Sequence, residues 1–466
     1  MKLLCSFLLF TSFAFSQTVV NGGIYQNTTW TLANSPYLMT GSVVVFPGKT
    51  LTIEPGVEVL VTPDFSGSTG NFRYLEIRGS LVAVGTDQAP ITFEPSDTTN
   101  PGFPTWTGIT IKGSQGGTFQ LDRFRVNNSM YGLYNDIVEP GVTYNFTNCQ
   151  FKRNQYAIQL NADMVYQNCL FQENGVGQAA QIQYGTLTAN NCQFINNFCS
   201  FTWSNNIQVT NCLFEGNGNN IVGSPGTISD CQFINNDFGL AEAYGHTLTN
   251  CYFSGNGVGI DNTGNGTISN CTFENNDVAL RLGDAGNVSN NLITNNAIGI
   301  SIVGSNPSSS SIIDNVICSN TLYNLKNQTD KNFQVNANCF CTADSAVVEN
   351  FIYDGYDDIT KGLVNYALYD DSCQTILEYV VKVNLGNSSL TEINQSSFQI
   401  MQQTSEYLVI QVPVPTTIQL VDLTGSTLKE QKIDQATQQF QLPNYTSGFY
   451  ILKDLEGNTK KVFLQK

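Results

Sequence analysis

A short phrase of alternating apolar and polar positions recurs through the middle of the chain. It reads apolar-x-Asn-Cys-x-Phe-x-x-Asn at residues 268–276, and it returns every 19 to 23 residues. Its cysteines, called the ladder cysteines below, are Cys149, Cys169, Cys192, Cys212, Cys231, Cys251 and Cys271. Phe lies two residues after each of them and Asn five residues after. Because alternate residues of a strand point to opposite faces, Cys and Phe are expected on one buried face.

A fixed period of this length indicates stacked, nearly identical units. Each unit has room for three short strands and two or three bends, and none for a helix. Asn and Gly stand between the apolar positions, and both tolerate the left-handed backbone of a bend. Parallel stacking of such units gives a solenoid with one narrow core. The chain is therefore predicted to be all-β, a right-handed parallel β-helix followed by a small C-terminal β-sandwich.

The ladder cysteines are interpreted as core fillers. Parallel strands in neighbouring turns lie about 4.8 Å apart, so thiols can stack, but their parallel Cβ vectors suit a disulfide poorly. Zinc sites need interleaved His or paired Cys, which the repeat lacks. No metal and no cofactor is therefore predicted. The recurring Asn is expected to form stacks of buried amides that hydrogen-bond from turn to turn.

Charged residues at equal repeat positions provide a test of this alignment. Arg153 and Glu173 both lie four residues after their ladder cysteine, and Asp261 and Arg281 both lie ten residues after theirs. Each pair is predicted to meet across neighbouring turns.

Composition divides the chain into five segments. Residues 1–16 carry Lys2 near their start, continue as an apolar run and end in a small-residue cleavage site, which predicts a signal peptide. Residues 17–118 are interpreted as capping and opening turns, 119–338 as the regular solenoid, and 339–396 as a terminal turn and linker. Residues 397–466 lack the repeat and hold six of the fourteen lysines, which predicts a separate β-sandwich.

The charge balance narrows the range of partners. Lys and Arg number 20 against 37 Asp and Glu, and the net charge of −17 argues against nucleic acid and anionic lipid. Charged residues make up only 12% of the chain, which suits a solenoid surface of uncharged polar side chains. After the signal peptide no stretch approaches the ~18 apolar residues of a membrane span. An exported protein without a membrane span is predicted.

Five further cysteines follow the signal peptide. Cys199 and Cys318 lie near the ladder cysteines, whereas Cys339, Cys341 and Cys373 lie beyond the regular turns. Export favours disulfides. A disulfide from Cys373 to either Cys339 or Cys341 is predicted, and both partners remain open.

The solenoid carries motifs of a known family. Residues 48–56 read Gly-Lys-Thr-Leu-Thr-Ile-Glu-Pro-Gly, and residues 79–86 read Gly-Ser-Leu-Val-Ala-Val-Gly-Thr. Together with the repeat, they resemble the exported bacterial β-helix proteins of pectin-lyase-like architecture, over about residues 20–360. Residues 352–364 resemble the terminal turn of that family. The resemblance implies relatives that include lyases and hydrolases of acidic polysaccharides.

Residues 397–466 resemble a second family. The motifs Asp-x-x-Gly at 422–425, Gly-x-Tyr at 448–450 and a basic C-terminal strand occur in the order typical of type IX secretion sorting domains of Bacteroidetes. The resemblance implies that the type IX machinery is a partner. It also implies passage through the periplasm to the outer cell surface or the medium. A carbohydrate-binding or immunoglobulin-like module is the alternative for this segment.

Candidate catalytic residues are few. A lyase uses a base such as Arg or Lys to abstract a proton, or an ion to acidify that proton, and residues 154–280 contain no Lys or Arg. The remaining candidates for a base at the edge of the repeat are Arg123, Arg125, Lys152 and Arg153.

A hydrolase needs two carboxylates on either side of one bond. Asp237 and Asp277 share a repeat position but lie two turns apart, roughly 10 Å, and Glu215 and Glu274 lie three turns apart. The single histidine, His246, is interpreted as a solvated bend residue. No catalytic residue is assigned.

Two functions remain in consideration. The first is a non-catalytic rod at the cell surface or in the matrix that binds an extracellular polysaccharide or other cells. The second is a polysaccharide lyase or glycoside hydrolase. The tyrosines suit glycan stacking, although aromatic residues at strand spacing more often serve packing.

Overall fold

The fold is that of a computed structural model. It describes residues 17–63, 72–97, 104–175, 178–181, 185–202, 206–221, 225–242, 244–261, 264–306, 309–366, 369, 373, 399–403, 407–412, 416–421, 426–433, 437–443, 448–454 and 459–464. The signal peptide predicted at residues 1–16 lies outside the described residues. No helix among the described residues is long and apolar enough to cross a membrane.

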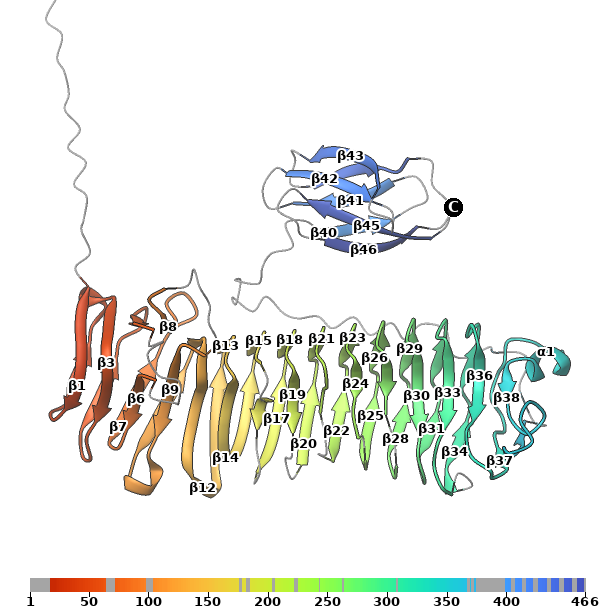
Figure 1. Cartoon of the computed structure of the whole chain (residues 1–466), viewed down its shortest axis with the longest axis horizontal. Coiled ribbons are helices and arrows are strands. Elements are labelled where there is room, and N and C mark those ends of the chain that lie inside the picture. The colour runs from red at the N-terminus through yellow and green to blue at the C-terminus, as the bar shows by residue number, and fades with distance from the viewer. Residues whose placement is uncertain are drawn as a thin grey trace, which may run out of the picture. The chain divides into compact units, whose positions relative to one another are not determined.

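The first compact unit is a solenoid of parallel strands, which confirms the predicted right-handed β-helix (Figure 1). One stack of strands carries the repeated Phe. Its members are β1 (Thr18–Ile24), β3 (Tyr37–Val45), β5 (Glu58–Val61), β8 (Ile91–Pro95), β11 (Phe124–Asn127), β13 (Gln150–Lys152), β15 (Leu170–Gln172), β18 (Gln193–Ile195), β21 (Leu213–Glu215), β23 (Gln232–Ile234), β26 (Tyr252–Ser254), β29 (Thr272–Glu274), β32 (Leu292–Thr294) and β35 (Val316–Cys318).

A second stack precedes the ladder cysteines in each turn. It consists of β17 (Thr186–Asn190), β20 (Asn206–Thr210), β22 (Gly226–Ser229), β25 (His246–Thr249), β28 (Thr267–Ser269), β31 (Asn287–Ser289) and β34 (Ser311–Ile313). Near the N-terminus a four-stranded sheet holds β2 (Thr28–Trp30), β4 (Thr50–Ile53), β7 (Ser80–Val84) and β10 (Thr118–Asp122). Short 3-10 turns occupy Leu32–Asn34 and Gly113–Gln115.

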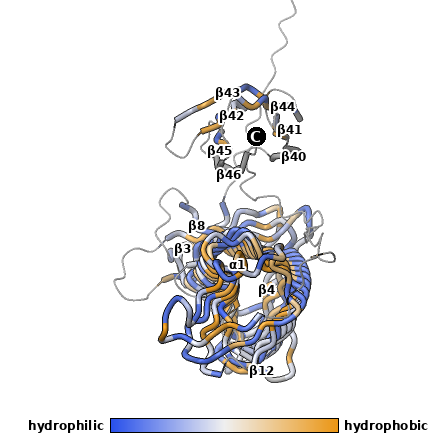
Figure 2. The backbone as a smooth tube through the Cα atoms, turned by 90° about the vertical axis from the view of Figure 1, so that its right-hand side faces the viewer, coloured by the Kyte–Doolittle hydropathy of each residue, from blue (hydrophilic) through white to orange (hydrophobic). Residues whose placement is uncertain are grey.

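A third stack follows the repeated Phe. Its members are β6 (Tyr74–Ile77), β9 (Trp106–Ile111), β12 (Ser129–Thr147), β14 (Tyr156–Gln167), β16 (Gln178–Gln181), β19 (Cys199–Thr202), β24 (Phe238–Leu240), β27 (Val258–Ile260), β30 (Val278–Leu282), β33 (Ile298–Ile302), β36 (Tyr323–Asn327) and β38 (Ile352–Tyr353). Isolated bridges through Asn219 join β19 to β24. The long strands β12 and β14 continue into the second stack. Viewed along the axis, successive turns superimpose around one core (Figure 2).

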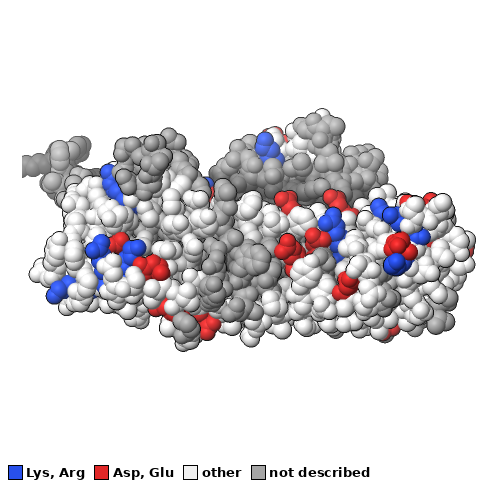
Figure 3. Space-filling view, turned by 60° about the horizontal axis from the view of Figure 1, so that its bottom comes forward, with Lys and Arg blue, Asp and Glu red and all other residues white. Residues whose placement is uncertain are grey.

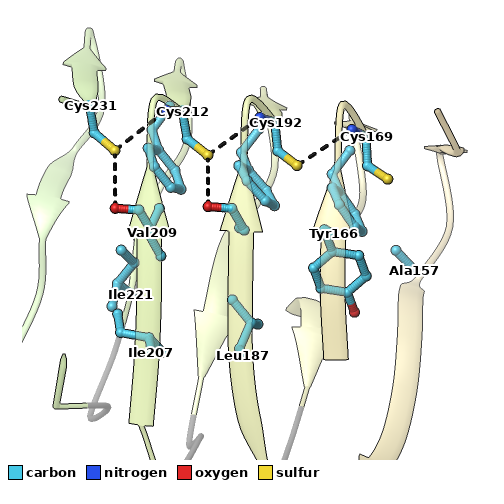
Figure 4. Close-up of a cluster of buried hydrophobic side chains, with 14 of the residues drawn as sticks. Ala157, Tyr166, Cys169, Leu187, Cys192, Ile207, Val209, Cys212, Ile221 and Cys231 are labelled. Carbon is cyan, nitrogen blue, oxygen red and sulfur yellow. Dashed lines mark hydrogen bonds between the residues drawn. The ribbon is translucent and has the colours of Figure 1, made fainter. Parts of the chain in front are cut away.

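The ladder cysteines stack inward as predicted, and all of them are buried (Figure 4). The Sγ atom of Cys212 accepts the N–H of Cys192 at 3.4 Å and donates to the carbonyl of Thr210 at 3.3 Å. The rings of Phe194 and Phe214 stack beside them with centroids 4.9 Å apart. The thiols therefore satisfy backbone groups as well as filling the core.

The recurring Asn forms the predicted stack of buried amides. The Asn217 side chain accepts the N–H of Asn197 at 2.7 Å and donates to the carbonyl of Phe194 at 2.8 Å. The bend residues have left-handed backbone, such as Asn211 with φ 55°. The predicted charge pairs also form, Arg153 with Glu173 at 2.6 Å and Arg281 with Asp261 at 3.3 Å. These contacts confirm the alignment of the repeats.

The C-terminal end of the solenoid is closed by residues 333–369 and two disulfides. It contains β37 (Phe333–Gln334), helix α1 (Ser345–Glu349) and β39 (Val364–Asn365). Cys373 pairs with Cys339, which settles the predicted choice of partner. A second disulfide between Cys318 and Cys341 was not predicted, because Cys318 was grouped with the ladder cysteines.

In the second compact unit, residues 390–466, the described strands pair antiparallel. One sheet holds β40 (Gln399–Gln403), β41 (Tyr407–Gln411) and β44 (Thr437–Gln441). The other holds β42 (Thr416–Val421), β43 (Thr427–Ile433), β45 (Gly448–Asp454) and β46 (Thr459–Leu464). Leu408, Ile418 and Phe440 belong to its own buried core. A core separate from that of the solenoid is what the predicted sandwich requires.

Candidate functional site

An open groove with a volume of about 460 Å³ crosses the opening turns of the solenoid. It extends over four strands of successive turns, β3, β6, β9 and β12, and over the segment before β6. Its lining combines aromatic rings with hydroxyl groups and one carboxylate. The lining residues are Ser42, Phe72, Tyr74, Glu76, Thr107, Thr110, Tyr131 and Tyr134.

The strand register explains why this surface is hollow. Tyr74, Gly108, Tyr131 and Tyr156 occupy one position in four successive turns. Gly108 has φ +110°, and a Cβ atom there would lie 1.5 Å from the carbonyl oxygen of Tyr131. Only glycine fits this backbone. The column of rings is therefore interrupted by a position without a side chain, which leaves space between Tyr74 and Tyr131.

The tyrosines form a continuous strip next to this space. The rings of Tyr131 and Tyr156 stack with centroids 5.3 Å apart, and those of Tyr131 and Tyr134 are tilted at 5.2 Å. Burial and the neighbouring phenols of Tyr156 and Tyr134 raise the pKa of Tyr131. The hydroxyl group of Tyr131 therefore stays protonated at neutral pH. The strip offers apolar ring faces together with hydroxyl donors and acceptors.

One carboxylate occurs among the lining residues that the structure describes, and a cation already pairs with it. Glu76 pairs with Arg78 at 2.6 Å. The nearby Asp136 accepts from the Ser114 hydroxyl at 2.7 Å and lies 3.5 Å from the Lys112 ammonium. These contacts with Ser114 and Lys112 lower the pKa of Asp136 despite its partial burial. Charged groups on the face in Figure 3 likewise lie in small patches between wide uncharged areas.

Two of the residues predicted as candidate bases are held in ion pairs, and the other two lie at different positions of neighbouring strands. Arg123 contacts Asp87 at 2.7 Å and also pairs with Asp122. The hydrogen bond with Asp87 raises the pKa of Arg123, the opposite of what a general base needs. Arg153 pairs with Glu173 at the other end of the turn. Arg125 lies on β11 and Lys152 on β13, two register positions apart.

The candidate carboxylate pairs are not brought together. The amide of Val258 bonds the carbonyl of Asp237, and the amide of Asp277 bonds that of Asn256. One turn therefore lies between the turns that carry the two aspartates. The aspartates are two turns apart, as predicted, and their backbones are roughly 10 Å from each other. Glu274 accepts a hydrogen bond from the Tyr252 hydroxyl, and Glu215 lies three turns away on β21.

The interpretation of His246 as a solvated bend residue is wrong. His246 begins β25, points inward in phase with Leu248 and is only 1% exposed. Its column neighbour in β22 is Gly226, which leaves space for the ring. Burial lowers the pKa of His246 to about 4. The imidazole is therefore neutral and inaccessible to a substrate.

Sequence analysis missed the tyrosine groove. Tyr74, Tyr131 and Tyr156 come from turns that lack the cysteine phrase or stand at its edge, and they are separated by 57 and 25 residues. The isolated Gly108 inside the strand Trp106–Ile111 was the available signal, because a glycine within a strand often marks close backbone approach.

Each of the two parts of the chain matches a known protein family. Residues 107–267 match the family of the right-handed beta helix region, and residues 404–465 match the secretion system C-terminal sorting domain. Protein bark beetle of Drosophila melanogaster is 35% identical over 74 residues, which are 16% of this chain and 2% of that protein. The chain thus spans a small fraction of that relative.

One solved structure also aligns with much of the chain. It is the tailspike protein gp49 of Acinetobacter baumannii bacteriophage Fri1, a capsular polysaccharide depolymerase. The alignment covers 89% of this chain and 77% of the tailspike chain, with 11% identity and a TM-score of 0.27, and at this similarity it carries no argument. The family matches are decisive: the chain carries a right-handed β-helix region and a type IX sorting domain that directs it to the cell surface or outside.

Proposed function

We propose that the exported solenoid is a non-catalytic glycan-binding protein of the cell surface or matrix, and that the tyrosine groove holds the glycan. Pyranose rings present apolar C–H faces and a rim of hydroxyl groups. The tyrosine strip matches the apolar faces, and Ser42, Thr107 and the phenol hydroxyls match the rim. The sorting domain delivers the groove to the compartment where such glycans occur.

The observation that carries this proposal is a ring-lined groove whose described lining has one carboxylate, Glu76, which Arg78 neutralises. A glycoside hydrolase needs two carboxyl groups about 5–9.5 Å apart. A lyase needs a base whose pKa is near the working pH. Arg78 is paired with the groove carboxylate instead of being poised as a base. Binding without bond cleavage is the activity that these groups support.

A panel of neutral and acidic polysaccharides tests the proposal. The exported chain should be retarded in native gels that contain at least one of them, while the release of reducing ends and of unsaturated products stays at the level of a boiled sample. Products that increase in proportion to protein concentration would instead establish a lyase or hydrolase. If the protein is not retarded by any polysaccharide and releases no products, a glycan function is rejected.

A further inference from the structure

A second, larger cavity opens where the solenoid ends. Its volume is about 880 Å³, within the usual size range of small-ligand sites. It lies between β34 and the pair of strands β37 and β39, far along the chain from the tyrosine groove.

A break in the strand stack creates this cavity. β34 pairs with β31 on one side, whereas β37 pairs only with β39 among the described strands. Hydrogen bonding between the turn that contains β34 and the turn that contains β37 resumes at Asp314. Its amide donates to the carbonyl of Ala337 at 2.9 Å. Residues Ser311–Ile313 therefore border an opening instead of a neighbouring strand.

One polar atom at this opening has no partner. The Oδ1 atom of Asn336 is buried and makes no hydrogen bond within the part of the chain that the structure describes. A buried acceptor without a donor is costly, so such atoms usually have a water or ligand partner. Asn336 lines the cavity, and a water molecule enclosed beside it would supply the missing donor.

The remaining lining indicates the class of ligand. Tyr356 lines the cavity and is 79% exposed, and Tyr366 is also part of the lining. The Asn332 and Gln334 amides add donors and acceptors. Among the described lining residues there is no Lys or Arg, and the one carboxylate there, Glu349, already accepts the Tyr366 hydroxyl at 2.5 Å. An anionic ligand would find no counter-charge here.

We infer that this end cavity binds an uncharged oligosaccharide. The exposed Tyr356 ring, the half-buried Tyr366 ring and the side-chain amides of the lining suit a ligand with apolar faces and many hydroxyl groups. Phosphorylated ligands and acidic sugars need cations that the lining does not hold. The inference is independent of the groove, so the two sites are tested separately.

The experiment uses the full exported chain with Tyr131→Ala, which disables the groove. Neutral hexasaccharides of glucose, mannose and xylose, together with hexagalacturonate, are titrated by calorimetry. We expect one neutral hexasaccharide to bind at a ratio of one to one and hexagalacturonate not to bind. Adding Tyr356→Ala should weaken that binding on the order of tenfold. Ile359→Ala, in the same loop, 96% exposed and outside the lining, should leave it unchanged.

Several outcomes would overturn the end site. They are equal effects of Tyr356→Ala and Ile359→Ala, tighter binding of hexagalacturonate than of every neutral sugar, and no binding to the Tyr131→Ala chain. If the unaltered chain binds and the Tyr131→Ala chain does not, the end site falls and the groove proposal stands. If Tyr131→Ala changes no binding at all, the groove proposal falls while the end site stands on the Tyr356→Ala result.

Discussion

At the scale of single residues, His246 links the core to pH. Its pKa is about 4 in the fold and about 6.5 when exposed, because burial disfavours the imidazolium. Above pH 6.5 the imidazole is neutral in both the folded and the unfolded chain, and His246 does not reduce the free energy of unfolding. As the pH falls from about 6.5 to about 4, the unfolded chain binds a proton that the folded chain cannot bind. Stability is therefore lost in this window, by on the order of 3 kcal/mol.

The variant His246→Leu should remove this loss. Its denaturant midpoint should fall less than that of the unaltered protein when the pH is lowered from about 7.5 to about 4.5. Carboxylates titrate in both proteins, so the comparison isolates the histidine. Parallel pH profiles for the two proteins would show that His246 takes up its proton in the fold without cost.

The ladder cysteines make a second prediction at this scale. The column position of Cys212 is filled by Asn291 further along the chain, where the amide accepts the N–H of Cys271 at 2.9 Å and donates to Ile268 at 3.0 Å. Ile268 corresponds to Ala189, whose carbonyl accepts from the Cys212 thiol at 3.7 Å, so Asn accepts and donates across neighbouring turns as the thiol does. Cys212→Asn should cost less stability than Cys212→Val, which leaves the Cys192 amide unsatisfied at about 1–3 kcal/mol. Chemical denaturation measures the free energy of unfolding of both variants. A valine variant at least as stable as the asparagine variant would contradict the prediction.

At the scale of elements, the repeat predicted most of the solenoid. Phase and period are sufficient to align Cys, Phe and Asn, because each must face the same narrow core in every turn. The candidate sites were harder to predict. The tyrosine groove depends on Gly108 and on turns of irregular length, and the end cavity depends on a break in pairing after β34. Neither has a period, and the burial of His246 depends on the glycine in the neighbouring turn.

The cysteines give a direct measurement at this scale. The seven ladder cysteines are free and buried, and four further cysteines form the disulfides at the end of the solenoid. Thiol titration of the exported protein, unfolded without reductant, should therefore find at least seven thiols. Cys373→Ser should raise this number by one, because Cys339 loses its partner. Four or fewer thiols in the unaltered protein would contradict the stacked ladder.

At the scale of the whole molecule, export and folding should be separable. The solenoid and residues 390–466 have separate cores. Deletion of residues 397–466 should leave the thermal midpoint of the solenoid unchanged, and its circular dichroism spectrum should remain that of β-structure. The truncated chain should accumulate within the cell envelope instead of reaching the surface. Surface labelling and fractionation check the location. A truncated chain that still reaches the surface would show that the sorting domain is dispensable.

The central claim is that the tyrosine groove binds glycan, and one titration tests it most directly. The polysaccharide that retards the unaltered protein is titrated into that protein, into Tyr131→Ala and into Tyr25→Ala. Tyr25 is 67% exposed and lies outside the groove. The account predicts that Tyr131→Ala weakens binding on the order of tenfold, whereas Tyr25→Ala has no effect. Equal affinities for all three proteins would contradict it.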